Sequence, residues 1–214
     1  MMTPATDPRV DAHLAESPLV MILRGVRREE ILDVAEALID GGIRLLEVTM
    51  NTDNALEILE RLVDRYGDSQ DVLIGAGTVV DAGDVDVLAG IGVRFIVSPN
   101  TDGRVIERTR ELDLVSMPGF FSPTEAFAAA GYGGQYLKCF PAHIVGPGFI
   151  RDLKAVLPSP VLAVGGVTPG NAQEYLSTCV GLGVGGSVWG PGMSPDEGRA
   201  RVIDLLAACS ADAS

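Results

Sequence analysis

The sequence predicts a compact (β/α)8 TIM barrel that forms a single α/β domain, and three observations support this prediction. Eight short β-rich runs alternate along the chain with amphipathic stretches of roughly ten to fifteen residues, a rhythm that favours a parallel sheet covered by helices. The first run continues as ILRGVRREE without a glycine-rich turn, which disfavours an open doubly wound sheet. Glycine pairs come instead after the seventh and eighth runs, where such barrels commonly bind a phosphate group.

The chain is long enough for one well-buried core. It has 214 residues, of which 47% are hydrophobic, and one domain is the expected organisation at this size. Residues 1–17 are polar and contain proline and aspartate, so we expect an N-terminal arm or capping helix there. The barrel itself is expected over residues 18–210.

The expected strands are short and mostly apolar. In chain order they are LVMIL (19–23), LLEVT (45–49), VLIGAGT (72–78), RFIVSP (94–99), LVSMPG (114–119), YLKCF (136–140), VLAVGG (161–166) and VGLGVGGS (180–187). After the first strand, Ile31, Val34 and Leu38 recur at helical spacing before a pair of glycines, which predicts an amphipathic helix that ends there. TDNALEILERLVDRYG and VDAGDVDVLAGIG repeat this pattern, and PDEGRARVIDLLAAC predicts a closing helix.

The net charge of −13 and the isoelectric point near 4.4 limit the partners of the protein. A field of this sign repels nucleic acid and anionic membranes, so neither is expected to bind. An anionic metabolite then needs a local site made of backbone amides and a few arginines. The N-terminal stretch lacks the features of a signal peptide and no apolar run reaches the length of a membrane span, so we expect a cytoplasmic protein.

Neither the cysteines nor the histidines have the spacing of metal ligands. Cys139, Cys179 and Cys209 are scattered and odd in number, and His13 lies far from His143 in the sequence. A zinc site or a disulfide framework is therefore not expected, and the sequence predicts no metal or other cofactor.

Lys138 is the most unusual residue of the sequence, because it is one of only two lysines beside fourteen arginines and lies in the apolar run YLKCF. Burying an ammonium group costs several kcal/mol unless it is paired or neutralised. Strand alternation turns Lys138 and Phe140 toward the barrel interior, while Leu137 and Cys139 face the helices. A desolvated lysine can lose its proton and attack a carbonyl group, a reaction for which arginine is unsuited.

Further polar side chains are expected at the carboxyl ends of the strands, where barrel enzymes place their catalytic groups. Glu47 points inward from the second strand, and a buried salt bridge with Lys138 is the plain alternative to a catalytic pair. Arg24 ends the first strand and is suited to hold a carboxylate bidentately. Thr78 ends the third strand and is also placed to cap the following helix. His143, which closely follows Lys138, is a secondary candidate for contact with substrate.

The two glycine pairs, Gly165–Gly166 and Gly185–Gly186, serve either as tight turns or as a phosphate cradle. Each pair taken singly fits a tight strand-to-helix turn. Together, after adjacent strands, they favour a cradle, because glycine lets backbone N–H groups approach phosphate oxygens and a following helix N-terminus attracts the anion. Ser187 follows the second pair, and VTPGN after the first supplies a Thr-Pro helix start.

The sequence resembles the 2-keto-3-deoxy-6-phosphogluconate (KDPG) and 2-keto-4-hydroxyglutarate (KHG) aldolases in six stretches that keep their order and spacing. These stretches are LLEVTMNT, LIGAGTVVD, FIVSPN, YLKCFPA, VLAVGGVTPGN and GVGGS. The resemblance runs from about residue 18 to residue 205. It implies a class I, Schiff-base aldolase of small (β/α)8 fold, usually a homotrimer, that acts on pyruvate and a phosphorylated 2-keto-3-deoxy sugar acid.

The resemblance also assigns a role to each matching residue. Lys138 corresponds to the lysine that forms the Schiff base, and Glu47 corresponds to the general acid/base. Thr78 corresponds to the threonine that helps to hold the pyruvyl carboxylate. The phosphate and the remainder of the substrate are expected against Phe140, Gly165, Gly166, Gly186 and Ser187.

Two positions depart from the gluconate-specific pattern of this family. That group has arginine four positions after the glutamate, where this sequence has Asn51, and threonine before the first glycine pair, where it has Val164. We expect Arg24 to replace the missing guanidinium at the substrate carboxylate. With ILRG and AVGGVTP, these positions resemble the 2-keto-3-deoxy-6-phosphogalactonate (KDPGal) aldolase branch, which implies cleavage to pyruvate and D-glyceraldehyde 3-phosphate.

Three alternatives stay open on the sequence. In the first, the substrate is KDPG or 4-hydroxy-2-oxoglutarate instead of KDPGal, which differs from KDPG only in configuration at C4. In the second, the protein is a different phosphate-binding barrel enzyme, such as an isomerase or a synthase, in which Lys138 only pairs with an anion. In the third, the protein is a non-catalytic barrel that binds a phosphorylated metabolite.

Overall fold

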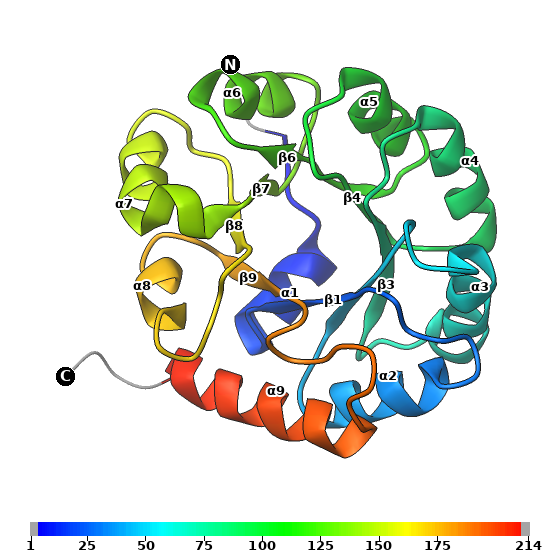
Figure 1. The fold of residues 1–214 in the computed structure, drawn as a ribbon. Helices are drawn as coiled ribbons and strands as arrows, with labels where there is room; N and C mark the ends of the chain where they lie inside the picture. The colour runs from blue at the N-terminus through cyan, green and yellow to red at the C-terminus, as the bar shows by residue number, and fades with distance from the viewer. Residues whose placement is uncertain (1–3, 211–214) are drawn as a thin grey trace.

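The computed structural model describes residues 4–210 and shows parallel strands that form a barrel surrounded by helices (Figure 1). The strands are β1 (Leu19–Leu23), β2 (Leu45–Thr49), β3 (Leu73–Gly77), β4 (Phe95–Val97), β5 (Val115–Met117), β6 (Gly119–Phe120), β7 (Leu137–Cys139), β8 (Val161–Val164) and β9 (Gly181–Val184). Hydrogen-bonded neighbours follow the order β5-β4-β3-β2-β1-β9-β8-β7-β6. The prediction of a single-domain (β/α)8 TIM barrel is therefore confirmed.

The fifth predicted strand, LVSMPG (114–119), is divided in two in the structure. Pro118 has no N–H to donate to the ladder and separates β5 from β6. The chain continues directly into β6, where Gly119 pairs with Lys138, and the N–H of Lys138 donates to the carbonyl of Pro118 at 2.8 Å. The nine strands thus occupy the eight predicted positions, and the segment around Pro118 closes the barrel.

Helices follow the strands and cover the outside of the barrel. They are α2 (Ile31–Asp40), α3 (Ala55–Tyr66), α4 (Ala82–Ile91), α5 (Gly103–Glu111), α6 (Pro123–Gly131), α7 (Ala142–Lys154), α8 (Ala172–Leu176) and α9 (Pro195–Ser210). Outward-facing strand residues such as Leu46, Leu137 and Cys139 belong to the core between barrel and helices, as strand alternation predicts. The closing helix α9 packs against both α2 and α8 and completes the ring (Figure 1).

A smaller core fills the barrel interior and is covered from below by α1 (Pro8–Glu16). Val10 and Leu14 of this helix pack against inward-facing strand residues, and α1 lies in the middle of the ring of strands in Figure 1. The hydroxyl of Tyr136 donates to Asp11 Oδ1 at 2.6 Å, which links α1 to β7. Residues 1–3 of the segment predicted as an arm or capping helix lie outside the described residues.

Two kinds of element are absent from the part of the chain between residues 4 and 210. No helix in this range is long and apolar enough to cross a membrane. Nor do three or more His, Cys, Asp or Glu side chains in this range come together in a way that could hold a metal ion.

Burial among apolar residues raises the pKa of the Cys139 thiol to about 12, so this thiol is protonated at neutral pH.

Candidate active site

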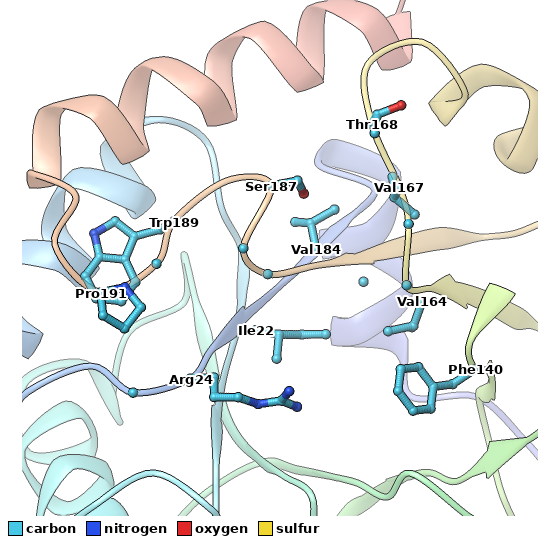
Figure 2. Close-up of a pocket in the computed structure, with 17 residues that line it drawn as sticks. Ile22, Arg24, Phe140, Val164, Val167, Thr168, Val184, Ser187, Trp189 and Pro191 are labelled. Atoms are coloured by element: carbon cyan, nitrogen blue, oxygen red, sulfur yellow. The ribbon is translucent and has the colours of Figure 1, made fainter. Parts of the chain in front are cut away.

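The cavity at the carboxyl ends of the strands is the candidate active site. It has a volume of about 660 Å³ and lies where β1, β7, β8 and β9 end (Figure 2). Its walls are largely apolar and include Ile22, Phe140, Val164 and Val184. Arg24 is the one charged residue among those that line it. Such a cavity suits a small ligand that carries a negative charge near one end.

Glu47 on β2 and Lys138 on β7 come from opposite sides of the barrel, and neither is among the residues that line the cavity. The side chains are almost fully buried, with 6% and 1% of their surfaces exposed. Lys138 Nζ lies 5.1 Å from the ring centroid of Phe140, which does line the cavity. Among the described residues no ion pair joins Lys138 to Glu47, and Glu47 Oε1 has no hydrogen-bond partner. The plain alternative of a buried salt bridge is therefore not formed.

Burial shifts both ionisable groups toward their neutral forms. Desolvation raises the pKa of Glu47 above its ordinary range, against the opposing attraction of Lys138 and Arg24. Desolvation also lowers the pKa of Lys138; the nearby Glu47 opposes this shift, whereas the positive charge of Arg24 reinforces it. The site thus favours a neutral amine beside a protonated carboxyl, which are a nucleophile and a proton donor in one desolvated space.

The Glu47 carboxylate occupies a space that is free because Gly77 of strand β3 has no side chain. A Cβ atom on Gly77 would collide with Glu47 Oε1, so any side chain at this position displaces the carboxylate. The second glycine of the GAGT stretch is thus explained by close approach rather than by a turn. Sequence reasoning singled out this stretch but did not identify the role of Gly77.

Thr78 directly follows β3 and is half-buried. Its φ of 58° is in the left-handed region, which is uncommon for a residue with a branched Cβ. The prediction that Thr78 caps the next helix is wrong, because Asp81 is the N-cap of α4 and accepts from the N–H of Gly83 at 2.7 Å. The Thr78 hydroxyl is thus not occupied by capping.

The first glycine pair forms a turn that only glycine fits. Gly165 and Gly166 have φ values of 98° and 76°, and a Cβ on Gly166 would collide with the side chain of His143. The backbone N–H groups of Gly166, Gly186 and Ser187 make no hydrogen bond to another group of residues 4–210. All three residues line the cavity, so these N–H groups are available to the oxygens of an anion.

The expectation that a helix starts directly after each glycine pair needs correction. After the first pair, α8 begins at Ala172 instead of at the Thr-Pro step and has only five residues. After the second pair the chain makes a single turn, in which Trp189 donates its N–H to the carbonyl of Gly185, and α9 begins at Pro195. The backbone of the turns, rather than a helix dipole, is what these pairs offer to an anion.

Arg24 and Ser187 lie on different sides of the cavity. Figure 2 shows the Arg24 guanidinium extended from the end of β1 toward Phe140, and Ser187 on the loop that follows β9. Arg24 has no ion-pair partner among residues 4–210. Several other surface arginines in this range are paired with carboxylates. The Arg24 guanidinium is therefore free to bind a carboxylate that enters the cavity.

Besides Lys138 and Glu47, three predicted positions do not line the cavity: Thr78, Asn51 and His143. Asn51 is exposed in the turn after β2, and His143 is exposed at the start of α7 next to Gly166. A contact of Asn51 with substrate stays a prediction.

Sequence reasoning missed the wall formed by Trp189 and Pro191. Both lie in the segment between β9 and α9, where neither strand nor helix periodicity reveals the direction of a side chain. Trp189 is 2% exposed, and its indole N–H has no partner among the described residues. The available signal was that Trp189 is the sole tryptophan of the chain.

The chain is similar to known proteins over most of its length. A family model described as "Aldolase: KDPG and KHG aldolase" matches residues 10–202. The probable 2-dehydro-3-deoxy-6-phosphogalactonate aldolase of Rhizobium meliloti (strain 1021) is 41% identical over 199 residues, which are 92% of this chain and 93% of that protein. The 2-dehydro-3-deoxy-6-phosphogalactonate aldolase of Escherichia coli (strain K12) is 42% identical over 180 residues, which are 83% and 87% of the two chains.

Solved structures share the fold at similar coverage. One described as "Native KDPGal structure" matches with a TM-score of 0.86 at 39% identity, over 89% of this chain and 93% of that one. A KDPG aldolase from Legionella pneumophila, with pyruvate captured at low pH as a covalent carbinolamine intermediate, matches with a TM-score of 0.76 at 29% identity. That match covers 93% of this chain and 95% of the other.

Proposed function

Because the chain belongs to the KDPG and KHG aldolase family, we propose that it is a class I aldolase that cleaves KDPGal to pyruvate and D-glyceraldehyde 3-phosphate. The observation that carries this function is the pair of buried, unpaired groups Lys138 and Glu47 beneath the cavity. The names of the two relatives at 41% and 42% identity support the choice of substrate.

The reaction begins with attack of Lys138 on the C2 ketone of the substrate. The neutral amine, favoured by desolvation, adds to the carbonyl and gives a carbinolamine. Glu47 supplies the proton with which the hydroxyl leaves as water, because burial keeps its carboxyl protonated to higher pH than usual. The product is a protonated Schiff base, and Glu47 is left as a carboxylate.

The Schiff base then accepts the electron pair of the bond that breaks. The Glu47 carboxylate takes the proton of the C4 hydroxyl, the C3–C4 bond cleaves, and its electrons reach the iminium nitrogen to give an enamine. D-Glyceraldehyde 3-phosphate is released. Glu47 returns a proton to C3, and hydrolysis of the resulting imine frees pyruvate and restores the Lys138 amine.

The two anionic ends of the substrate are held by different parts of the site. Arg24, with Thr78 and Asn51 as further candidates, binds the carboxylate that becomes part of pyruvate. The turns at Gly166 and Gly186 bind the phosphate through backbone N–H groups. Binding through backbone atoms and a single guanidinium reconciles an anionic substrate with a net charge of −13.

Val164 is the position that we connect with the choice of C4 epimer. It is 5% exposed, lines the cavity and presents a methyl group where the gluconate-specific pattern has a hydroxyl. A wall that lacks a hydrogen-bonding group changes which C4 hydroxyl configuration is held productively. KDPG and 4-hydroxy-2-oxoglutarate are the alternative substrates. The assembly proposed from the family is a homotrimer in the cytoplasm.

Reductive trapping tests the chemistry. The protein is incubated with pyruvate and sodium borohydride, and the peptides are mapped by mass spectrometry. We expect an adduct on Lys138 and none on Lys154, the other lysine of the chain, which serves as an internal control. A folded protein without an adduct on Lys138 contradicts the aldolase function and favours the isomerase, synthase or binding-protein alternatives.

A second assay tests the substrate. Pyruvate release from KDPGal and from KDPG is followed with a coupled dehydrogenase. We expect a higher kcat/KM for KDPGal and a shift of the ratio toward KDPG in Val164→Thr. A clear preference of the wild type for KDPG would overturn the choice of substrate while leaving the Schiff-base chemistry intact.

A further inference from the structure

We propose that Thr49 and Thr52 form a hydroxyl clasp that holds Arg24 in the orientation needed to bind the substrate carboxylate. The two threonines lie in the stretch LLEVTMNT, but neither of them lines the cavity. Their role is therefore to position Arg24 rather than to contact substrate. The inference rests on the proposed function, in which Arg24 binds the carboxylate end.

The clasp connects the end of β2 to the two residues that flank Arg24. The Thr49 hydroxyl donates to the carbonyl of Leu23 at 3.4 Å, and the Thr49 and Thr52 hydroxyl oxygens are 3.1 Å apart. The N–H of Gly25 donates to Thr52 Oγ1 at 3.0 Å. The backbone of Arg24 is thus held on both sides by one pair of side chains.

The number of hydroxyl hydrogens on Thr49 and Thr52 determines which group donates in each hydrogen bond of the clasp. Each hydroxyl has one hydrogen to donate, and that of Thr49 is given to Leu23. Thr52 must therefore donate to Thr49 while it accepts from Gly25. Thr49 is fully buried and Thr52 is 5% exposed, whereas the bond from Gly25 to Thr52 is part-buried. Loss of the Thr52 hydroxyl removes both the acceptor of the Gly25 N–H and the donor to Thr49.

The backbone at this point gives the clasp its importance. Gly25 has a φ of 70°, so the strand direction changes immediately after Arg24. Arg24 is itself exposed and has no ion-pair partner among the described residues. The hydrogen bonds to its two neighbours therefore fix the backbone from which the guanidinium extends. Thr49 at the end of β2 supplies one of them, and Thr52 in the turn that follows supplies the other.

The decisive variant is Thr52→Val, which keeps the shape of the side chain and removes the acceptor for Gly25. In the condensation direction we expect KM for pyruvate to rise about tenfold, the factor that corresponds to one lost hydrogen bond, with KM for D-glyceraldehyde 3-phosphate unchanged. Thr52→Ser, which restores the hydroxyl, should return KM for pyruvate to near the wild-type value. Thr109→Val is the matched control, because Thr109 is fully buried and donates to Val105 on the remote helix α5.

A double-mutant cycle identifies the route of the effect. In an Arg24→Met background, Thr52→Val should raise KM for pyruvate no further, because the group it positions is gone. An undiminished effect in that background, or equal rises in KM for both substrates, would show that Thr52 acts on the whole fold and would overturn the clasp.

A readout without turnover separates this inference from the proposed function. The Nε–H signal of Arg24, assigned in NMR spectra by its loss in Arg24→Met, should move in Thr52→Val and stay in place in Thr52→Ser. An unmoved signal in Thr52→Val would overturn the clasp. Failure of the wild type to trap pyruvate would instead refute the aldolase function, and the NMR comparison would still decide whether Thr52 orients Arg24.

Discussion

At the scale of single residues, the candidate site contains buried ionisable groups that folding does not favour. Lys138 and Glu47 are buried without an ion pair between them, and Glu47 Oε1 has no partner among the described residues. Removing an ionisable group from water without pairing it destabilises the folded chain. Active sites commonly carry such a cost in stability.

The first prediction concerns the stability of Lys138→Met. The unfolded lysine has a pKa near 10.5, and burial lowers the pKa in the folded state. Between these two values the unfolded chain binds more protons, so the stability contributed by Lys138 rises with pH up to 10.5 and is lost as the pH falls through the folded pKa. We expect Lys138→Met to be inactive, more stable than the wild type at neutral pH, and less distinct from it as the pH approaches 10.5.

Urea unfolding at a series of pH values measures this difference. Lys154→Met is the matched control, because Lys154 is only half-buried at the end of α7 and its replacement should give no comparable change with pH. A Lys138→Met variant that is less stable than the wild type at neutral pH would show that the lysine stabilises the fold.

The sequence predicted the direction of side chains that lie on strands, but not of those that lie in irregular segments. Alternation along YLKCF and LLEVT predicted the inward direction of Lys138 and Glu47, because a strand has a fixed side-chain period. Thr52 and Trp189 lie in irregular segments, where the direction of a side chain depends on tertiary contacts. Gly77 was noticed only as part of a motif, since a space left free for another side chain has no signal in a single sequence.

At the scale of elements, strands were more predictable than helix starts. The predicted strand at 114–119 is divided because Pro118 cannot donate to the ladder, a consequence that the proline itself signals. Asp81 begins α4 with a side-chain capping bond, whereas Asn171, the N-cap of α8, makes no such bond to its helix. Asn171 instead accepts from the N–H of Thr168 and donates to the carbonyl of Gly166, so its side chain stabilises the glycine turn before it begins α8.

The second prediction concerns the attachment of α1 to the barrel. The fully buried Tyr136 hydroxyl donates to Asp11, and the N–H of Asp7 donates to the same hydroxyl at 3.2 Å. Tyr136→Phe should lower the free energy of unfolding by about 1–3 kcal/mol, because groups of α1 lose a buried partner. Because Tyr136 lies at the lower end of the barrel, kcat should change by less than twofold.

Chemical denaturation and steady-state kinetics check this prediction together. Tyr132→Phe is the control, since Tyr132 is 46% exposed at the end of α6 and its substitution should leave stability unchanged. A large loss of kcat in Tyr136→Phe without a loss of stability would mean that α1 acts on the site rather than on the fold.

At the scale of the whole molecule, the dominant feature is the excess of negative charge. The chain has twenty-nine acidic residues and sixteen basic ones. At a net charge of −13, repulsion between the negative charges destabilises the compact folded state. The few cations are used locally, as in the pairing of Arg108 with Asp86 and Glu111 on α4 and α5. The apolar core and the closed ring of helices hold the fold together against this repulsion.

The third prediction follows from the screening of this charge. Raising the NaCl concentration from near zero to about 0.2 M, where the Debye length falls below 10 Å, should raise the melting temperature at neutral pH. The increase should shrink as the pH is lowered toward the isoelectric point near 4.4, because the net charge then declines. Calorimetry at several pH values measures both effects, and a melting temperature that falls with salt would mean that attractive ion pairs outweigh the repulsion.

The helix α1 also affects the route by which substrate enters the cavity and products leave it. Because Val10 and Leu14 of α1 pack against the inner core of the barrel, we expect substrate and products to pass through the cavity at the carboxyl ends of the strands. In the proposed reaction the aldehyde half lies against the glycine turns at the rim, and the pyruvate half is attached to Lys138 beneath it. Departure is therefore ordered, with the phosphorylated aldehyde first and pyruvate second. In the reverse reaction, an aldehyde that arrives early obstructs the passage that pyruvate needs.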